Sequence, residues 1–318
     1  MAALTGGPAR IAVVVPTKDR PHKMRKLLHS LGEQEVECAQ VVVVDSGDSI
    51  EGLISEYATR LPIEYHRSKP GQILQRNLGL RQIRPDVELV ALLDDDIVFE
   101  KGALEAMLSA WRTLPPETAG VAFNIVNNPA IRRSYLGEFL GLSHRQPGQV
   151  LRSGLTTPNS PVDRDIRCQW LCGGATVWRR EVLMERRHQE IPSRWAIAED
   201  LIFSYPIGKR RPLFVCAASR VRHEHEAVPT TENLHRFHGR TQTKWTYYFV
   251  ESNEDLSRLA FFWTLALRAV GRCGRSLWRR NNDGFMFALG QLEGGLAALA
   301  ATVQGRDVVE IIRDEAGP

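Results

Sequence analysis

The chain has 318 residues, enough for one large domain with an appended segment or for two domains. Its apolar fraction of 43% and charged fraction of 25% are those of an ordinary globular protein. The net charge is +4 and the basic residues are scattered, so no nucleic-acid partner is expected. Only one dense basic group occurs, near the C-terminus, and it consists of Arg268, Arg272, Arg275, Arg279 and Arg280.

Cysteine usage and the N-terminus bear on the compartment. The cysteines are Cys38, Cys168, Cys172, Cys216 and Cys273, an odd number without a paired framework, which fits a reducing compartment. Cys168 and Cys172 with His223 and His225 could form a zinc site, although the usual C-x-x-C spacing is missing. Residues 1–10 lack the features of a signal peptide, and no segment reaches the roughly 20 apolar residues that span a bilayer. We therefore expect a cytoplasmic protein that could also touch the inner face of a membrane.

The first hundred residues alternate apolar strands with helical patterns. Strands are predicted at 11–15, 41–44, 61–66 and 87–93, and helices at 24–31, 50–60 and 72–83. Such alternation predicts an α/β domain with a mostly parallel central sheet and helices on both faces. Ligands of such sheets collect beyond the carboxyl ends of the strands. Polar side chains follow each strand there, so the ends of the strands are expected to form one polar rim.

Three consecutive acids, Asp94, Asp95 and Asp96, follow the apolar strand that ends at Leu93. Three adjacent carboxylates repel one another and resist desolvation, so the cluster favours a compensating cation. Mg²⁺ and Mn²⁺ prefer oxygen ligands and themselves bind phosphate. The alternative is a solvated acidic turn before the helix that is predicted to begin near Gly102. A glycine-rich phosphate loop is absent after the first strand, so metal and side chains are expected to hold any phosphate.

The middle of the chain carries three further candidate motifs. A helix is predicted at 104–114 and a strand at 120–124, and the irregular span 127–167 reads as a functional or disordered loop. Adjacent Gly173 and Gly174 indicate close backbone approach to a ligand or a strand, or else a tight bend. Glu199 and Asp200 open a helical run, where acids also favour the helix dipole. His223 follows a strand and is either a metal ligand or an ordinary hydrogen-bonded residue.

Taken together, these segments resemble the family 2 glycosyltransferases of the GT-A fold. The resemblance rests on seven ordered motifs, which are Pro16 to Arg20, Val44 to Asp48, Gly71-Gln72 with Gln75 to Gly79, Leu93 to Asp96, Gly173-Gly174 ahead of Arg179 to Val182, Glu199-Asp200 and His223. It covers residues 11–225. It implies a catalytic domain over 1–228, with a nucleotide-binding half at about 10–100 and an acceptor-binding half at 101–228. A C-terminal helical extension is expected at 229–318.

The resemblance implies a role for each matched residue. Asp96, Asp94 and His223 would ligate Mn²⁺ or Mg²⁺, and an imidazole ligand favours Mn²⁺ slightly. The nucleoside-diphosphate sugar, expected to be a UDP-sugar, would contact Pro16, Thr17, Arg20, Asp45, Gln72, Arg76, Asn77, Asp94 and Asp95. Within that set Asp45 would accept a hydrogen bond from the base, and Arg76 and Asn77 would reach the sugar or the diphosphate. Trp170, Gly173 and Gly174 would contact the acceptor.

The transfer reaction needs a base for the acceptor hydroxyl, which belongs to a saccharide, a lipid-linked molecule or a natural product. A carboxylate within hydrogen-bond reach can take that proton in the transition state. We assign Asp200 as the base and Glu199 as its neighbour that orients the acceptor, although the pair could act in the reverse order. Attack opposite the leaving group implies inversion at the anomeric carbon. The run Leu201 to Pro206 lacks the charged residue that family members often carry after the acidic pair.

The C-terminal segment allows two interpretations. Helices are predicted at 234–250 and 285–303, and between them 256–268 is the most apolar stretch of the chain. One hypothesis is an interfacial element that inserts Phe261, Phe262 and Trp263 and places Arg268, Arg272 and Arg275 at anionic headgroups. The other is a helix that packs on the catalytic domain or forms a homodimer contact.

Two other functions remain open from the sequence. A catalytically silent binding module would keep the strands but could lose the base or the ligands, and Asp94, Asp96, Asp200 and His223 are all present. A sugar-nucleotide nucleotidyltransferase would need a glycine-rich basic loop after the first strand, and the segment Pro16 to Arg20 has no glycine.

Overall fold

The computed structural model describes residues 9–131, 134–191, 197–225 and 231–313. Internal contacts divide the chain into two compact units. The first unit comprises residues 1–131, 158–190 and 203–225, and the second comprises 132–157, 191–202 and 226–318. Two segments of the predicted acceptor-binding half therefore group with the C-terminal helices.

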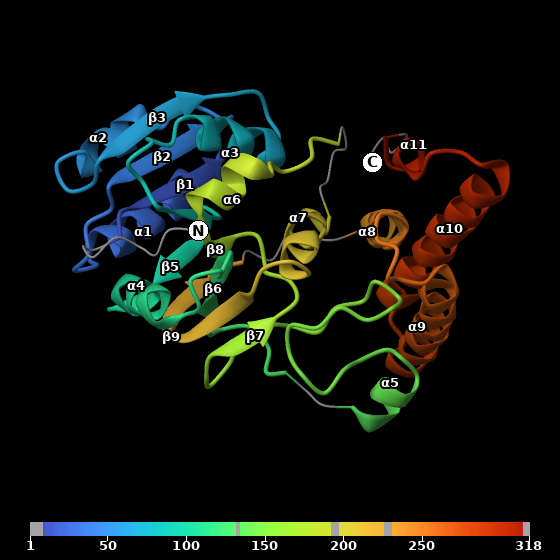
Figure 1. Cartoon of the computed structure of the whole chain (residues 1–318). Coiled ribbons are helices and arrows are strands. Elements are labelled where there is room, and N and C mark those ends of the chain that lie inside the picture. Colours follow the sequence, from blue (N-terminus) through green and yellow to red (C-terminus); the bar gives the residue numbers. More distant parts are fainter. Residues whose placement is uncertain (1–8, 132–133, 192–196, 226–230, 314–318) are drawn as a thin grey trace. The chain divides into compact units, whose positions relative to one another are not determined.

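The first unit is built on a nine-stranded sheet with the order β3-β2-β1-β4-β8-β6-β9-β5, and β7 pairs with β9 (Figure 1). Its strands are β1 (Ile11–Thr17), β2 (Gln40–Asp45), β3 (Ile63–Arg67), β4 (Leu89–Leu93), β5 (Ile97–Phe99), β6 (Gly120–Ile125), β7 (Ile166–Cys168), β8 (Ala175–Arg179) and β9 (Leu213–His223). The strands β1, β2, β3, β4, β6 and β9 run in one direction, and β5, β7 and β8 run against them. This is the mixed, mostly parallel α/β sheet that the sequence predicts.

Helices cover both faces of this sheet because its strands are apolar on both sides. The helices are α1 (Pro21–Gly32), α2 (Glu51–Tyr57), α3 (Gln72–Arg81), α4 (Ala103–Thr113), α6 (Arg180–Glu185) and α7 (Glu199–Gly208), whose first residues belong to the second unit. Val13 and Val15 point into one core cluster with side chains of α1, α2 and α4. Ala12 and Val14 point into the other cluster, with side chains of α3, α6 and α7.

The register of the parallel strands brings their polar ends together. Thr17 at the end of β1 is opposite Asp45 at the end of β2, and Asp45 is opposite Arg67 at the end of β3. Gln75 on α3 donates to the carbonyls of Thr17 and Val44 at 2.8 and 2.7 Å, which ties these strand ends to the helix. The single polar rim that the sequence predicts is therefore confirmed for these strands.

The second unit is mainly helical. Its helices are α5 (Tyr135–Phe139), α8 (Glu232–Glu251), α9 (Arg258–Arg279), α10 (Asp283–Gln304) and α11 (Val308–Arg313). Glycines let α8 and α10 touch through their backbones. A Cβ atom at Gly290 would lie 1.9 Å from the Arg236 carbonyl oxygen, and one at Gly239 would lie 2.1 Å from the Phe287 carbonyl oxygen. This close crossing buries one face of α10.

Two expectations for the C-terminal segment are corrected by this packing. Phe261 is buried beside Tyr247, with 5.1 Å between ring centroids, so it does not insert into a lipid surface. The Arg272 guanidinium lies 4.2 Å from the centroid of the Phe287 ring, within the bundle. In addition, α10 is long and apolar enough to cross a bilayer by length and composition, contrary to the expectation of no such segment. About two fifths of its apolar window is buried.

Candidate active site

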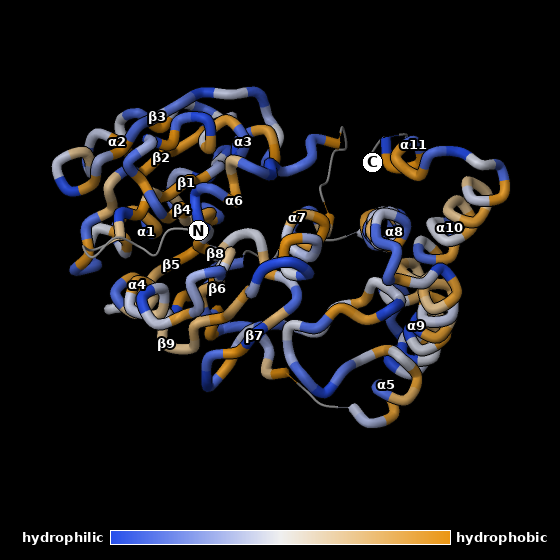
Figure 2. Tube along the Cα trace, viewed as in Figure 1, coloured by the Kyte–Doolittle hydropathy of each residue, from blue (hydrophilic) through white to orange (hydrophobic). Residues whose placement is uncertain are grey.

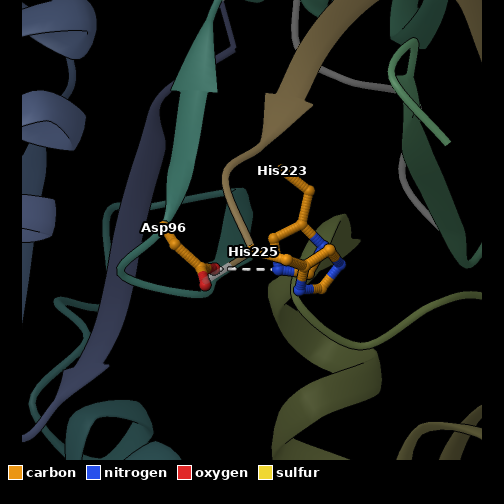
Figure 3. A group of neighbouring side chains, drawn as sticks. All are labelled: Asp96, His223 and His225. Atoms are coloured by element: carbon orange, nitrogen blue, oxygen red, sulfur yellow. Dashed lines mark ion pairs between the residues drawn. The ribbon is translucent and has the colours of Figure 1, made fainter. Parts of the chain in front are cut away.

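Asp96, His223 and His225 converge at one end of the sheet (Figure 3). The antiparallel pairing of β5 with β9 places Ile97 opposite His223, and Asp96 directly precedes that residue. A tight turn, in which the His225 N–H donates to the His223 carbonyl, brings the two imidazoles together with centroids 3.5 Å apart and ring planes tilted by 42°. One ligand atom from each residue lies within 4.8 Å of the others. One carboxylate and two imidazoles form a donor set that suits a divalent transition metal such as Mn²⁺.

The Asp96 carboxylate is held in its ionised form. Burial raises its pKa, but His223 at 2.8 Å and Lys23 at 3.2 Å outweigh that effect and lower the pKa to about 2. The pKa of His225 is lowered, first by burial and then by the charge of His223. Neutral imidazole is the form that ligates a metal. The shifts of Asp96 and His225 are therefore towards the charge states that ligate a cation.

Asp95 has hydrogen-bond partners of its own. Its carboxylate accepts hydrogen bonds from the Thr17 hydroxyl at 2.8 Å and from Arg20 at 3.1 Å. Burial raises the pKa of Asp95, although Thr17 and Arg20 act in the opposite direction. Arg20 also lies 3.7 Å from Asp96. Thr17, Arg20 and Asp95 thus connect the end of β1 and the start of α1 to the acids that follow β4.

Asp94 is placed by a different set of contacts. Its Oδ1 atom accepts from Gln72 Nε2 at 2.9 Å and from Arg76 Nη2 at 2.7 Å, and Arg76 is almost fully buried. The Asp94 N–H donates to the Gly174 carbonyl at 2.8 Å. A Cβ atom at Gly174 would lie 2.0 Å from Asp94 Oδ2, so a larger residue there would displace that carboxylate. The close approach that the glycine pair predicts is therefore made to the side chain of Asp94.

Asp45 is fully buried at the end of β2. Its carboxylate accepts from the Gly47 N–H at 2.8 Å, the Tyr65 hydroxyl at 2.6 Å and Arg67 Nη1 at 2.5 Å. The hydrogen bond that Arg67 donates to the Tyr65 hydroxyl, and then the charge of Asp45, raise the pKa of Arg67. The carboxylate that the sequence assigns to a nucleobase therefore also fixes an aromatic hydroxyl and a half-exposed guanidinium.

The other residues predicted to contact substrate lie in varied surroundings. Pro16 is buried within β1. The amide nitrogen of Asn77 donates to the His188 carbonyl and to Glu190, both at 2.8 Å, so in this structure it holds the segment after α6. Gly173 and Trp170 are half-buried in the segment before β8. Their assignment to the acceptor stays a prediction.

Glu199 and Asp200 open α7 and belong to the second unit. The Asp200 carboxylate accepts from the Leu201 N–H at 2.8 Å, and the preceding Ala198 has φ of 61°. Both acids are half-buried. Residues 192–196, which lead into this pair, lie outside the described residues. The catalytic roles of Glu199 and Asp200 stay predictions.

No role was predicted for Lys23 at the acidic site or for Tyr65 beside Asp45. Sequence reasoning placed His225 on the same strand face as His223, and Arg67 on the polar rim, without assigning to either the contacts that the structure shows. Lys23 is three residues beyond Arg20 at the start of α1, a spacing that places both on one helix face. His225 is two residues beyond His223, and a turn rather than the strand brings it into the cluster. Helical spacing thus gave a signal for Lys23, and strand alternation gave one for His225.

The sequence family described as Glycosyl transferase family 2 matches residues 12–185, more than half of the chain. The chain therefore belongs to this family, and it is a glycosyltransferase. The match includes the acidic triplet, the glycine pair and the strand ends that form the rim. No curated protein sequence matches the chain.

Solved structures of similar fold agree with this family. The chain is similar to Staphylococcus aureus TarS 1–349, with TM-score 0.55 and 14% identity over 93% of this chain and 92% of that one. It is also similar to the mannosyltransferase PcManGT from Pyrobaculum calidifontis, with TM-score 0.55 and 16% identity over 96% of this chain and 81% of that one. GalNAc-T7 matches with TM-score 0.51 and 14% identity over 81% of this chain and 54% of that one. These likenesses establish the GT-A fold.

Proposed function

We propose that the protein is a metal-dependent, inverting glycosyltransferase that moves a sugar from a nucleoside-diphosphate donor to an acceptor hydroxyl. The observation that carries the proposal is the cluster of Asp96, His223 and His225 beside Asp94, which buried Arg76 holds at the rim of the sheet. A glycosyl transfer leaves negative charge on a diphosphate, and this rim gathers cation ligands and cationic side chains. The same features favour transfer from a donor that carries phosphate.

A divalent ion is expected at Asp96, with His223 and His225 as further ligands. The two nitrogen donors favour Mn²⁺ over Mg²⁺. PcManGT and GalNAc-T7 were both solved with Mn²⁺. When bound, the ion would act as a Lewis acid that stabilises the departing diphosphate. Lys23 contacts Oδ2 of Asp96, the oxygen that does not face His223. It would fix that carboxylate and offset part of its charge.

The donor nucleotide is expected along the ends of β1, β2 and β4. Thr17 and Arg20 hold Asp95 there, and Asp45 with Tyr65 and Arg67 would bind the base. TarS has been solved with UDP and PcManGT with GDP-Man, so relatives of this fold accept different bases. We propose UDP for this chain, because the carboxylate of Asp45 suits the imide N–H of uracil.

Asp200 is the proposed base, and Glu199 is expected to orient the acceptor. A carboxylate that removes the proton as the oxygen attacks would contribute roughly 10²–10⁴-fold to the rate. Trp170 and Gly173 are expected at the acceptor side, and Gly174 acts through Asp94. A base on the face opposite the leaving group produces inversion at the anomeric carbon.

The test is release of nucleoside diphosphate from a panel of UDP-, GDP- and dTDP-sugars, with simple glycosides as acceptors. Each reaction is run with Mn²⁺, with Mg²⁺ and with EDTA, and the product anomer is determined by NMR. We expect turnover of a UDP-sugar with Mn²⁺, none with EDTA, and inverted product. Full activity in EDTA would contradict the metal, and a retained anomer would contradict the role of Asp200.

A further inference from the structure

Helices α9 and α10 of the second unit each carry an apolar stripe that is mostly exposed, although Trp263 also donates through Nε1 to the Leu140 carbonyl. On α9 it consists of Leu259, Trp263, Ala266, Val270, Cys273 and Leu277, and on α10 of Phe285, Leu289, Leu292, Leu296, Leu299 and Val303. Both follow the spacing 4-3-4-3-4, which is the heptad seam of helices that pack against other helices. The exposed fractions of Leu259, Val270, Leu296 and Val303 are 84, 71, 67 and 78%. We call these two stripes the α9 seam and the α10 seam; Figure 2 shows apolar segments recurring along both helices.

Both seams lie on the side of the α9–α10 pair that faces away from α8. Gly290 and Gly294 of α10 contact the backbone of α8, and the α10 seam lies roughly half a turn around the helix from them. Phe261 of α9 packs on Tyr247 of α8, and the α9 seam again lies roughly half a turn away. Gly295 and Leu265 join the two helices to each other. The seams therefore form one face of a helical hairpin.

We propose that a second copy of this chain covers this face, so that two hairpins pack as a four-helix arrangement. The spacing favours helices as the occupant, because a heptad seam presents a narrow row of knobs rather than the broad face of a lipid-bound helix. Self-association needs no further protein of matching shape, since an apolar seam is complementary to a copy of itself. The proposal is independent of the donor and the metal.

The charge distribution of α9 disfavours an anionic lipid surface. Arg268, Arg272, Arg275 and Arg279 recur at 4-3-4 spacing and lie roughly half a turn from the α9 seam. Arg272 packs over Phe287, and burial lowers the pKa of both Arg268 and Arg272. A bilayer placed against the seams would thus face few of the basic side chains that attract anionic lipid.

The size of the face is sufficient for a dimer. Each helix has 22 residues and is about 33 Å long, and two helices 8–10 Å apart present a face about 18–20 Å wide. Covering it would bury about 600 Å² on each copy, or about 1,200 Å² in total, which is the lower limit of specific interfaces. The contact is therefore expected to depend on protein concentration.

The test is sedimentation equilibrium of the full chain over a range of concentrations, without detergent. The variant carries Val270→Glu and Leu296→Glu, one change in each seam, and the control Arg275→Glu changes charge on the other side of α9. We expect the wild type and the control to dimerise and the double variant to be monomeric with unchanged circular dichroism. Because both altered side chains are exposed, the fold should tolerate the changes.

Two outcomes would overturn the proposal. A wild-type chain that is monomeric at all concentrations would do so, as would a control that dissociates like the double variant. Co-sedimentation with neutral and anionic vesicles is measured in parallel. If the wild type is a monomer that binds vesicles and the Val270→Glu, Leu296→Glu variant does not bind them, the face contacts lipid and not a second copy.

Discussion

The two units use glycine for opposite purposes. In the first unit Gly174 makes room for the carboxylate of Asp94, and a Cβ atom at Gly47 would lie 2.2 Å from the Asp19 carboxylate. In the second unit Gly239 and Gly290 make room for the backbone of a neighbouring helix. In the first case the glycine brings a charged side chain close to the backbone at the polar rim, and in the second it brings two helices together. At these positions glycine serves the rim in the first unit and helix packing in the second, although Gly79 and Gly120 also allow close packing within the first unit.

This difference predicts where substitutions act. Changes at the rim of the first unit should act mainly on turnover, with a smaller effect on stability where a carboxylate such as Asp96 is paired. Changes at the α8–α10 crossing should alter stability, because they force two backbones apart. Each of the following experiments tests one side of that contrast.

The largest effect is expected for Asp96→Ala. The change removes the single carboxylate of the cluster with His223 and His225, which Lys23 also contacts. Turnover should be abolished, a loss above the roughly 10²–10³-fold that one transition-state contact contributes. Binding of Mn²⁺, measured by electron paramagnetic resonance, should weaken in parallel. Asp86→Ala, at the opposite end of β4, is the control and should retain normal turnover; an active Asp96→Ala enzyme would refute the assignment.

Asp200→Asn should lower kcat by roughly 10²–10⁴-fold, the usual contribution of a positioned base. Donor binding should change little, since the amide keeps the size of the carboxylate and its contact with the Leu201 N–H. The matched variant is Glu199→Gln, which should raise KM for the acceptor more than it lowers kcat. The opposite pattern in the pair would transfer the role of base to Glu199.

The polar rim could be read from the sequence because its residues follow directly on apolar strands. β1, β2 and β4 are uniformly buried runs, and register alone places Thr17 beside Asp45. Two strands of three residues, β5 and β7, were not predicted, because so short a run carries no periodicity. Strand alternation puts His225 on the face of His223, but its place beside Asp96 was not predicted, because it depends on a turn and on pairing between distant strands.

The structure also distinguishes alternatives that the sequence left open. The sequence offered a ligand or a strand as the neighbour of Gly174, and only the three-dimensional arrangement identifies Asp94. Apolar helix 285–303 could be predicted, but not which of its faces is buried, because Gly290 and Leu292 give no sign of their neighbours. Which face of α10 is exposed is therefore decided by tertiary packing and could not be predicted.

Gly290→Ala tests the packing side of the comparison. Its methyl group would meet the Arg236 carbonyl at 1.9 Å, a backbone atom that cannot rotate away. The free energy of unfolding should fall by about 1–3 kcal/mol, as for other overpacked positions. Urea denaturation followed by circular dichroism measures it. Turnover per folded molecule should be unchanged, and a stable variant would show that α8 and α10 can separate at little cost.

Acid should weaken the first unit through Asp96. Its pKa is lowered to about 2 in the folded chain from an ordinary value of 3.8. A depressed pKa contributes stability above the unfolded value, and that contribution is lost as pH falls from about 4 through about 2. The shift corresponds to about 2 kcal/mol. Denaturation of Asp96→Asn should lack this part of the pH dependence, and an identical profile for both proteins would contradict it.

The smallest effect, with the opposite sign, is expected for Gly271→Ala. Gly271 lies within α9, is exposed, and has no atom within 4 Å of the place a Cβ would occupy. Its φ is not in the left-handed region, so alanine fits the backbone and removes the entropic cost of a glycine in a helix. The free energy of unfolding should rise by about 0.5–1 kcal/mol in the same urea experiment. Because Gly271 and Gly290 lie on neighbouring helices, opposite signs would show that close approach, rather than the glycine itself, decides stability in the second unit.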